Sequence, residues 1–251
     1  MQSSAPQSLL IRGALVFDGL GGPGVLTDVR IEDGRIAAVG ALTPAPGERG
    51  LDAAGLALAP GFIDTHSHHD RGLDDARDAL AAVSQGITTI VVGQDGGGAD
   101  LAALFARLEA RPAAVNVASY AGHGEIRERV MGDDYKRHAI AEEIDRMAAM
   151  LAREMAAGAL GLSTGLEYDP GIYASPAEVR TLAKVAADAG GRYISHIRSE
   201  DRDFWQALDE LIAIGRENRM PVQVSHIKLA MRGLWGRSAK LLEVLDAARA
   251  S

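Results

Sequence analysis

The chain has 251 residues, of which 47% are hydrophobic and 24% are charged, and its formal net charge is −8. This length and composition are ordinary for a globular protein with a substantial core, and an acidic chain without a basic tract disfavours nucleic acid as its main partner. The absence of cysteine excludes disulfides and thiol catalysis.

A secretory signal has a basic stretch followed by an apolar one, and the first residues of the chain do not have this pattern. No apolar run reaches the length needed to cross a bilayer. We therefore expect a cytoplasmic protein with neither a membrane nor a nucleic acid as partner; the sequence leaves its oligomeric state open.

Residues 1–58 form the first predicted domain, a set of short strands joined by turns. Strand-like runs occur at 9–11, 14–17, 28–32 and 35–39. Asp33-Gly34, between the last two runs, is a strong signal for a tight hairpin turn. The pattern predicts a small β-sheet region at the start of the chain.

Residues 59–251 form the second predicted domain, in which short apolar runs alternate with helical patterns, as in a parallel α/β fold. One helix has clear boundary signals, because Ser175 can cap it, Pro176 takes its first position and Gly190 follows its end. The clearest helical stretches are 101–109, 139–157, 176–189, 204–218 and 238–250.

Two histidines follow the first apolar run of this domain. His66 and His68 are separated by one residue at the end of the run Gly61-Phe62-Ile63-Asp64-Thr65. Side chains alternate along a strand, so both imidazoles should lie on the same face. Two neutral imidazoles on one face form half of a zinc site, although two neighbouring surface histidines are the simpler alternative.

Three later apolar runs also end at residues that can bind a metal, namely Asp95, His196 and His226. A parallel barrel gathers the carboxyl ends of its strands at one mouth. For His196 or His226 alone, a core imidazole bonded to the backbone explains the pattern equally well. Taken together, the strand ends predict that His66 and His68 hold one ion, and that Asp95, His196 and His226 hold a second ion or the only tightly bound one.

Four more residues near these strand ends are candidates for contact with a substrate. Arg198 and Lys228 each follow a predicted ligand by two positions, and either could bind a substrate carboxylate. Tyr168 follows a Gly-Leu-Glu turn and could donate to the scissile carbonyl or the substrate, or simply pack in its loop. His123 lies between two glycines and could line the pocket or lock its own loop.

Six segments of the sequence are more specific to one family than the paired histidines are. They are 59–68 (APGFIDTHSH), 86–89 (GITT), 122–124 (GHG), 161–168 (GLSTGLEY), 195–200 (SHIRSE) and 225–228 (SHIK). The chain therefore resembles the D-aminoacylase (N-acyl-D-amino-acid deacylase) branch of the amidohydrolase superfamily, from about Leu9 to its last residue. The paired histidines alone indicate only the superfamily, and the Ser-Thr-Gly-Leu segment with the two later histidine blocks narrows the likeness to this branch.

The resemblance implies a zinc-dependent enzyme that splits the amide bond of N-acyl-D-amino acids into a carboxylate and a D-amino acid. In the family mechanism a metal-activated water attacks the carbonyl, and the metal and a tyrosine-type donor stabilise the oxyanion. The implied catalytic residues are Tyr168 and Asp95, the implied substrate-binding residues are Lys228, Arg198, Tyr168 and His123, and the implied cofactor is one or two zinc ions.

The same resemblance implies the fold: a (β/α) barrel of the TIM type, as in metal-dependent hydrolases, beside a small β-sandwich to which residues 1–58 contribute one half. The family's barrel continues for two more strands, one of which supplies a proton-shuttling aspartate. We therefore expect 59–251 to form about six of eight strands of a truncated barrel. We also expect the isolated chain to be inactive and the complete protein to be a deacylase.

The chain departs from the family pattern at Asp95, where the family usually has a cysteine ligand. A carboxylate oxygen also binds zinc and can bridge two ions. No lysine ends the predicted fourth strand of the barrel, 159–163, which weakens the alternative of a dihydroorotase-like or hydantoinase-like cyclic amidase. A dipeptidase stays a further alternative. From another class, the chain could be a non-catalytic fragment that binds metal weakly.

Overall fold

The computed structural model describes residues 8–98 and 100–250, which divide into two compact units between Gly61 and Phe62. The domain boundary predicted between 58 and 59 is close to this division. Residues 1–7, on which most of the expectation about a secretory signal rests, lie outside the described residues. In the described ranges, no helix is both long enough and apolar enough to cross a bilayer.

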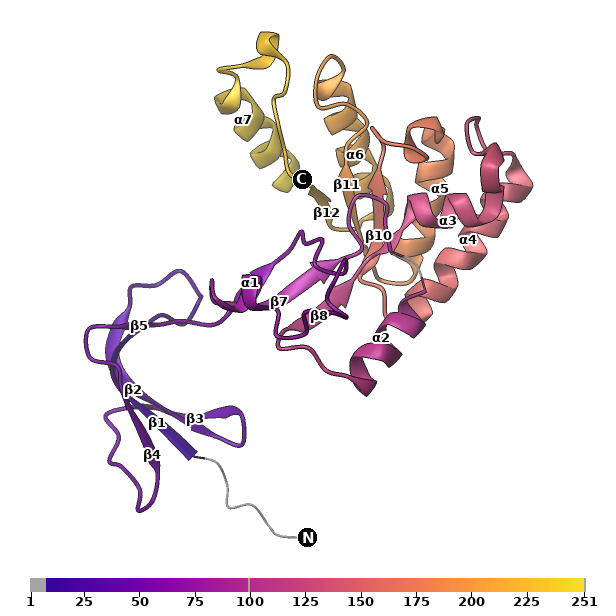
Figure 1. The fold of residues 1–251 in the computed structure, drawn as a ribbon. Helices are drawn as coiled ribbons and strands as arrows, with labels where there is room; N and C mark the ends of the chain where they lie inside the picture. The colour runs from indigo at the N-terminus through magenta and orange to yellow at the C-terminus, as the bar shows by residue number, and fades with distance from the viewer. Residues whose placement is uncertain (1–7, 99, 251) are drawn as a thin grey trace. The chain divides into compact units, whose positions relative to one another are not determined.

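The first unit is a sheet built on its longest strand, β1 (Ser8–Val16) (Figure 1). β2 pairs with β1 in antiparallel orientation and with β3 on its other side, while β4 and β5 pair with β1 in parallel orientation. The bounds of these four strands are Val25–Glu32, Arg35–Gly40, Arg49–Asp52 and Ala57–Leu58.

Two details of this sheet bear on the sequence predictions. The runs predicted at 9–11 and 14–17 belong to one strand, because the chain continues through an irregularity at Gly13, where the backbone N–H donates to Asp28 Oδ1 at 2.8 Å. The predicted hairpin turn is confirmed, since Asp33 and Gly34 have φ of 49° and 73°, the left-handed conformation that a type I′ turn requires.

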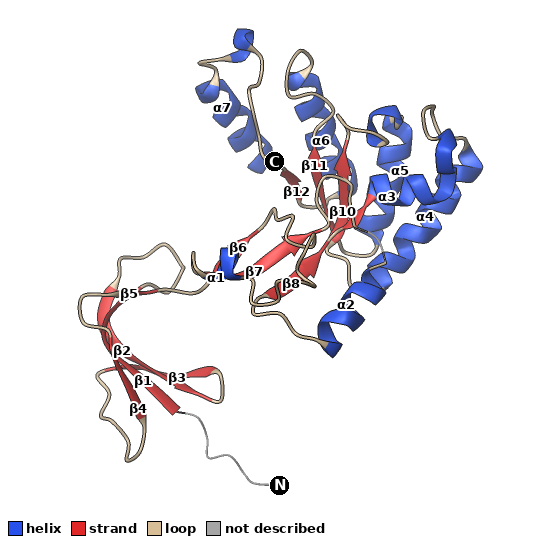
Figure 2. Cartoon of the chain, viewed as in Figure 1, coloured by secondary structure: helices blue, strands red, loops and turns tan. Residues whose placement is uncertain are grey.

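The second unit carries parallel strands in two sheets, with the order β6-β7-β8 and β9-β10-β11-β12 (Figure 2). Within each sheet every strand pairs with its successor in the chain, which is the strand order of a (β/α) barrel. Tyr120 separates β8 from β9, so the chain passes from one sheet into the other at this residue. The bounds are Phe62–Asp64, Ile87–Val92, Asn116–Ser119, Ala121–Gly122, Gly161–Gly165, Arg192–His196 and Val222–Val224.

Helices connect these strands. All five predicted helices are present, and the N-cap of α5 is confirmed because Ser175 Oγ accepts a hydrogen bond from Glu178 N at 3.2 Å. α1 and α3 were not predicted, and in α3 a run of charged residues hides the helical pattern. Helices α1 to α7 span Leu80–Val83, Leu101–Ala110, His123–Met131, Ala141–Ala156, Pro176–Asp188, Phe204–Asn218 and Ser238–Arg249, with short 3₁₀ turns at Gly132–Asp134, Gly171–Tyr173 and Arg232–Leu234.

The main core lies between these helices and the second sheet. α4 packs against α3 and α5, and α5 packs against α6 (Figure 2). Leu162 of β10 and Tyr193 of β11 are buried against Met147, Leu182 and Phe204 from three of the helices. Burial of each such side chain stabilises the fold by about 1.5–3 kcal/mol, so this core stabilises the sheet whose strand β11 ends at His196.

Candidate metal centre

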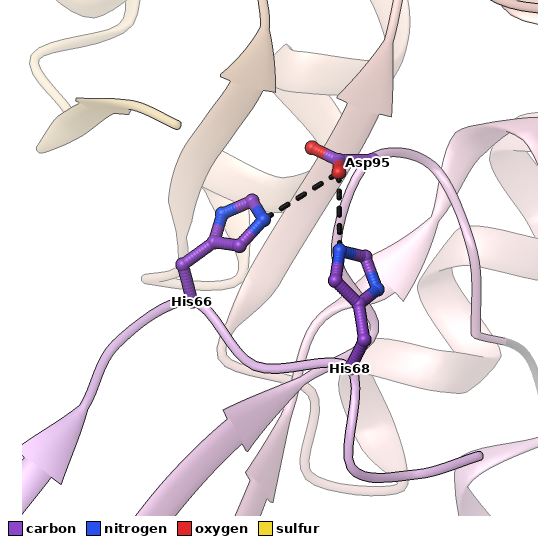
Figure 3. Close-up of side chains that lie close together, drawn as sticks. All are labelled: His66, His68 and Asp95. Carbon is purple, nitrogen blue, oxygen red and sulfur yellow. Dashed lines mark ion pairs between the residues drawn. The ribbon is translucent and has the colours of Figure 1, made fainter. Parts of the chain in front are cut away.

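The first predicted pair of ligands faces a single carboxylate (Figure 3). His66 and His68 follow β6, and their Nε2 atoms lie 3.4 Å and 3.2 Å from Asp95 Oδ2. Asp95 follows β7, the strand that pairs with β6 in parallel, so the two chain segments end side by side. The expectation that both imidazoles point the same way agrees with this geometry.

The second pair of histidines reaches the same carboxylate from the other sheet. His226 follows β12, and its Nε2 lies 3.5 Å from Asp95 Oδ2. His196 ends β11, and its Nδ1 lies 3.1 Å from His226 Nε2. The four histidines and Asp95 are named here the histidine–carboxylate centre, and Asp95 is the residue that its two halves share.

The atoms of this centre fit a divalent cation. Two overlapping groups, His66 with His68 and Asp95, and Asp95 with His196 and His226, each have their donor atoms within 4.8 Å of one another. Zinc–nitrogen bonds are about 2.0–2.1 Å long, so two ring nitrogens 3.1 Å apart can share one ion. Within residues 8–98 and 100–250, buried Asp95 Oδ1 and His66 Nδ1 have no hydrogen-bond partner, which leaves polar atoms available at the centre.

The charge of Asp95 is maintained by its neighbours. Burial by itself raises the pKa of this carboxyl, but the hydrogen bond and charge of His66, together with the charges of His226 and His196, lower the pKa to about 2. At neutral pH Asp95 is therefore an anion, the form that can bind or bridge metal ions.

Close backbone contacts hold Asp95 in place. Its φ of 54° is left-handed, a conformation that aspartate tolerates better than most residues. Ser163 on β10 supports the turn, since its Oγ donates to Gly93 O at 2.5 Å and accepts from Gly96 N at 3.2 Å. A side chain at Gly165 would place its Cβ 2.3 Å from Asp95 O, so only glycine allows β10 to approach this turn.

Tyr168 and Lys228, two of the predicted substrate-binding residues, lie at the centre. The hydroxyl of Tyr168 forms a short hydrogen bond with His196 Nδ1. Burial, reinforced by the charges of Asp95, Glu200 and Glu167, raises the pKa of Tyr168 to about 12, so the phenol keeps its proton. Lys228 Nζ lies 2.5 Å from Glu200 Oε1 and 2.7 Å from His226 Nδ1, and about half of its side chain is exposed.

Arg198 is already engaged elsewhere. Its guanidinium forms a two-bond ion pair with Glu210 of α6, at 2.9 Å and 3.0 Å, and donates to Ala174 O at 2.9 Å. These contacts fix the loop after β11 to α6. The Arg198 donors that were predicted to bind a substrate carboxylate therefore already have partners within the chain. The structure gives that prediction no support.

His123 belongs to a separate buried cluster, named here the arginine lock, with Arg127 and Glu178. All three side chains are fully buried. His123 Nε2 lies 2.8 Å from Glu178 Oε1, while Arg127 pairs with both oxygens of Glu178 and donates to the backbone carbonyls of Tyr135, Arg137 and Tyr173. This is the arrangement of the loop-locking alternative, and the prediction that His123 lines the substrate pocket finds no support in it.

Sequence reasoning did not select two carboxylates next to the centre, Glu167 and Glu200. Glu167 Oε2 lies 3.0 Å from His196 Nε2, and Glu200 Oε1 lies 3.2 Å from His226 Nδ1. Both occur in the segments that carry the family resemblance. Their position just beyond the ends of β10 and β11 was the available signal, because a parallel sheet brings such positions together.

The chain is similar in sequence to a protein family and to curated proteins. The model of the Amidohydrolase family matches residues 49–248. Two curated proteins of Alcaligenes xylosoxydans xylosoxydans are similar to the chain: an N-acyl-D-glutamate deacylase, 41% identical over 97% of this chain and 54% of that protein, and a D-aminoacylase, 37% identical over 98% of this chain and 56% of that protein. The chain thus spans about half the length of the curated relatives it matches.

Solved structures give the same result. An N-acyl-D-glutamate deacylase from Bordetella bronchiseptica, complexed with zinc and a phosphonate inhibitor that mimics the tetrahedral intermediate, superimposes with a TM-score of 0.92 at 38% identity, over 96% of this chain and 56% of that one. A D-aminoacylase described as having a binuclear metal centre superimposes with a TM-score of 0.91 at 37% identity, over 97% of this chain and 56% of that one.

Proposed function

The chain belongs to the amidohydrolase family, and on that premise we propose that the whole protein hydrolyses the amide bond of N-acyl-D-amino acids to a carboxylate and a D-amino acid. The observation that carries this proposal is the shared carboxylate, Asp95, with one histidine pair on each side of it. The similarity to an N-acyl-D-glutamate deacylase and a D-aminoacylase supports the choice of substrate class.

Zinc is the proposed cofactor, held by His66, His68, Asp95, His196 and His226. Imidazole nitrogens and carboxylate oxygens are donors that zinc accepts. When bound, such an ion supplies a nucleophile by lowering the pKa of water, and it polarises the carbonyl. A D-aminoacylase of similar structure is described as activated by one metal and attenuated by a second, and we propose one activating ion here as well.

Two residues of the chain would act on the substrate itself. Tyr168 keeps its proton because its pKa is raised to about 12. Its hydroxyl is bonded to His196 Nδ1, and once that nitrogen binds zinc its lone pair is no longer available, so the phenol can donate to the oxygen of the scissile carbonyl. Lys228, with an ammonium at the edge of the centre and a half-exposed side chain, would bind the carboxylate of the substrate as a point charge. Because Arg198 is already paired with Glu210, we assign the carboxylate-binding role to Lys228.

The barrel interpretation belongs to the same proposal. The sequential parallel order of β6 to β12 and the ligands after the strand ends are both typical of a (β/α) barrel with its active site at the carboxyl face. We propose that residues 59–251 contribute about six strands of such a barrel, and that 1–58 contribute to a small β-sandwich.

A cyclic amidase is the weaker alternative. In hydantoinase-like relatives a carbamylated lysine at the end of the fourth strand bridges the metals, but β10 ends here at Gly165. A Cβ at this position would lie 2.3 Å from Asp95 O, so no side chain of any kind fits there without moving Asp95.

The test is a panel of N-acetyl derivatives of D-Glu, D-Asp and D-Met, with the L-enantiomers and dihydroorotate as controls, assayed with the zinc-loaded whole protein. We expect the free D-amino acid to be released from at least one D-substrate, and His226→Ala to abolish that release. Hydrolysis of dihydroorotate alone would favour the cyclic amidase. Zinc binding without turnover of any substrate would favour a non-catalytic role for the chain.

A further inference from the structure

The segment between β10 and α5, residues 166–175, carries Tyr168 and is named here the Tyr168 loop. Strand β10 lies between β9 and β11 in its sheet. The loop therefore leaves the sheet between the segments that follow these two neighbours, which are α3 and the loop after β11. At its start, Leu166 N donates to His196 O at 3.0 Å, so the loop begins in contact with β11.

Near the end of the Tyr168 loop, two successive carbonyls each accept a hydrogen bond from a different arginine. Arg127 Nη2, from α3, donates to Tyr173 O at 3.4 Å. Arg198 Nη1, from the loop after β11, donates to Ala174 O at 2.9 Å. The end of the loop is thus bonded to the segments that follow both neighbouring strands.

Both guanidinium groups are themselves fixed by a carboxylate on a helix. Arg127 is fully buried and pairs with both oxygens of Glu178 on α5. Arg198 forms two bonds with Glu210 on α6, at 2.9 Å and 3.0 Å. Arginine presents five donors in a rigid fork, so one group can bind a carboxylate and a backbone carbonyl at the same time.

Internal contacts transmit this restraint along the Tyr168 loop. Ile172 N donates to Tyr168 O at 2.8 Å, and Ala174 N donates to Gly171 O at 2.9 Å. Gly171 lies against the end of β10, because a Cβ there would be 2.1 Å from Gly165 O. A loop that is bonded in this way and packed on its own strand has little freedom once its last residues are held.

Arg127 also reaches the Tyr168 loop by a second route. It donates to Tyr135 O at 3.1 Å, in the segment between α3 and α4. The hydroxyl of Tyr135 in turn donates to Asp169 Oδ2 at 3.2 Å, one residue after Tyr168. Arg127 therefore holds the loop directly at Tyr173 and indirectly beside the tyrosine that faces the centre.

We propose that Arg127 and Arg198 are positioning residues, which hold the phenol of Tyr168 against the histidine–carboxylate centre. This inference rests on the function proposed for Tyr168, because that function needs the phenol at a fixed place. It gives both arginines an effect on the reaction without contact with the metal or the substrate.

The first test asks whether Arg198 acts through Tyr168, and it uses the zinc-loaded whole protein. Arg198→Met should lower kcat by up to about 100-fold, since a misplacement of about 1 Å costs that much, and should change KM little. Combined with Tyr168→Phe, it should lower kcat no further than Tyr168→Phe alone, because coupled residues are not additive. The matched control is Arg180→Met, since Arg180 is an exposed arginine of α5 paired with Glu217, and its kcat should stay unchanged.

Two outcomes of this test would overturn the inference. A raised KM with unchanged kcat would mean that Arg198 binds the substrate itself. An equal loss of kcat with and without the phenol would mean that Arg198 supports the fold and not Tyr168.

Arg127 needs a milder variant, because its loss leaves Glu178 buried without its main partner. Arg127→Lys keeps a cation beside Glu178, but an ammonium is a point charge and cannot replace the fork that reaches the carbonyls of Tyr135 and Tyr173. We expect a loss of kcat that again disappears in the Tyr168→Phe background. Wild-type kcat in Arg127→Lys would remove Arg127 from the inference.

Hydrogen exchange, followed by mass spectrometry of the whole protein without substrate, tests the restraint separately from activity. Amides of residues 168–174 should exchange up to about tenfold faster in Arg198→Met and in Arg127→Lys, as expected for a lost hydrogen bond, while amides of β10 keep their wild-type rate. Unchanged exchange in the loop would overturn the inference. An inactive protein that shows the expected exchange would count against the proposed function alone.

Discussion

The histidine–carboxylate centre and the arginine lock are made of the same kinds of residue, but only the centre lacks a cation of its own. In the lock, Arg127 supplies donors to both oxygens of Glu178 and to backbone carbonyls, so the buried charges are balanced within the chain. In the centre, imidazole nitrogens face the Asp95 carboxylate, and among the described residues no arginine or lysine forms an ion pair with it. Whether a cluster can bind a metal is therefore decided by the balance of donors and acceptors.

The largest effect should come from breaking the lock. Arg127→Met leaves the Glu178 carboxylate buried with only His123 beside it, and removal of one partner from a buried ion pair costs about 3–5 kcal/mol. Urea unfolding measures this loss directly. Arg180→Met, which removes the exposed partner of Glu217, is the control and should cost no more than about 1 kcal/mol. A similar small cost for both variants would mean that the lock is not a structural element.

The centre should respond to zinc, as the lock should not. His196→Ala combined with His226→Ala should destabilise the metal-free chain by only about 1–3 kcal/mol, through the lost hydrogen bonds of buried His196 to Glu167 and Tyr168. Zinc should stabilise the wild-type chain by about 2.7 kcal/mol at a concentration one hundred times its Kd, and should not stabilise the double variant. Elemental analysis and unfolding with and without zinc check both parts. Equal zinc content in the two proteins would contradict the assignment of the ligands.

An intermediate effect is expected from a residue that binds nothing. Gly165→Ala would bring a methyl group within 2.3 Å of Asp95 O, so the turn that carries Asp95 must shift. We expect about tenfold weaker zinc binding, similar to the loss of a residue that supports a ligand, and a stability loss of about 1–3 kcal/mol from overpacking. The control is Gly233→Ala, where a Cβ would meet no atom within 4 Å. Unchanged affinity in Gly165→Ala would show that Asp95 does not depend on this contact.

The smallest effect concerns acid stability. Burial raises the pKa of Glu178, but His123 and Arg127 outweigh it and the pKa is lowered. The stabilisation by this ionised carboxylate is therefore present above the ordinary glutamate pKa of 4.5 and is lost as the pH falls through the lowered pKa of the folded state. Glu178→Gln should make the free energy of unfolding fall less steeply with decreasing pH below 4.5, as measured by urea midpoints. An unchanged slope would contradict the pKa assignment.

The contrast between the two clusters also explains what could be predicted from the sequence. His66, His68, His196 and His226 were found because period-two alternation and a parallel strand order place strand ends together, and both patterns are local. The partners of Arg198 and His123 are not local. Glu210 lies on α6, and Glu178 lies on α5, 55 positions after His123. No spacing rule connects these residues, so a free basic group and a paired one look alike in the sequence.

The helices also differ in whether a local sequence pattern could predict them. α6 was predicted with its observed bounds, because its apolar residues recur at helical spacing and bury Leu208 and Leu211. α3 was missed because its inward face carries Arg127 and His123 in addition to Ile126. From the sequence alone, a charged residue is assigned to the surface, because the partner that would allow its burial is not visible.

The carboxylate at position 95 has one more consequence, which concerns the conditions under which the protein can work. A thiolate ligand can be oxidised stepwise to sulfenic and sulfinic acid, and alkylating reagents also attack it. Every donor of the histidine–carboxylate centre is an imidazole nitrogen or a carboxylate oxygen. Peroxide or iodoacetamide should therefore leave its metal binding intact, and the chain can be purified in air without a reducing agent.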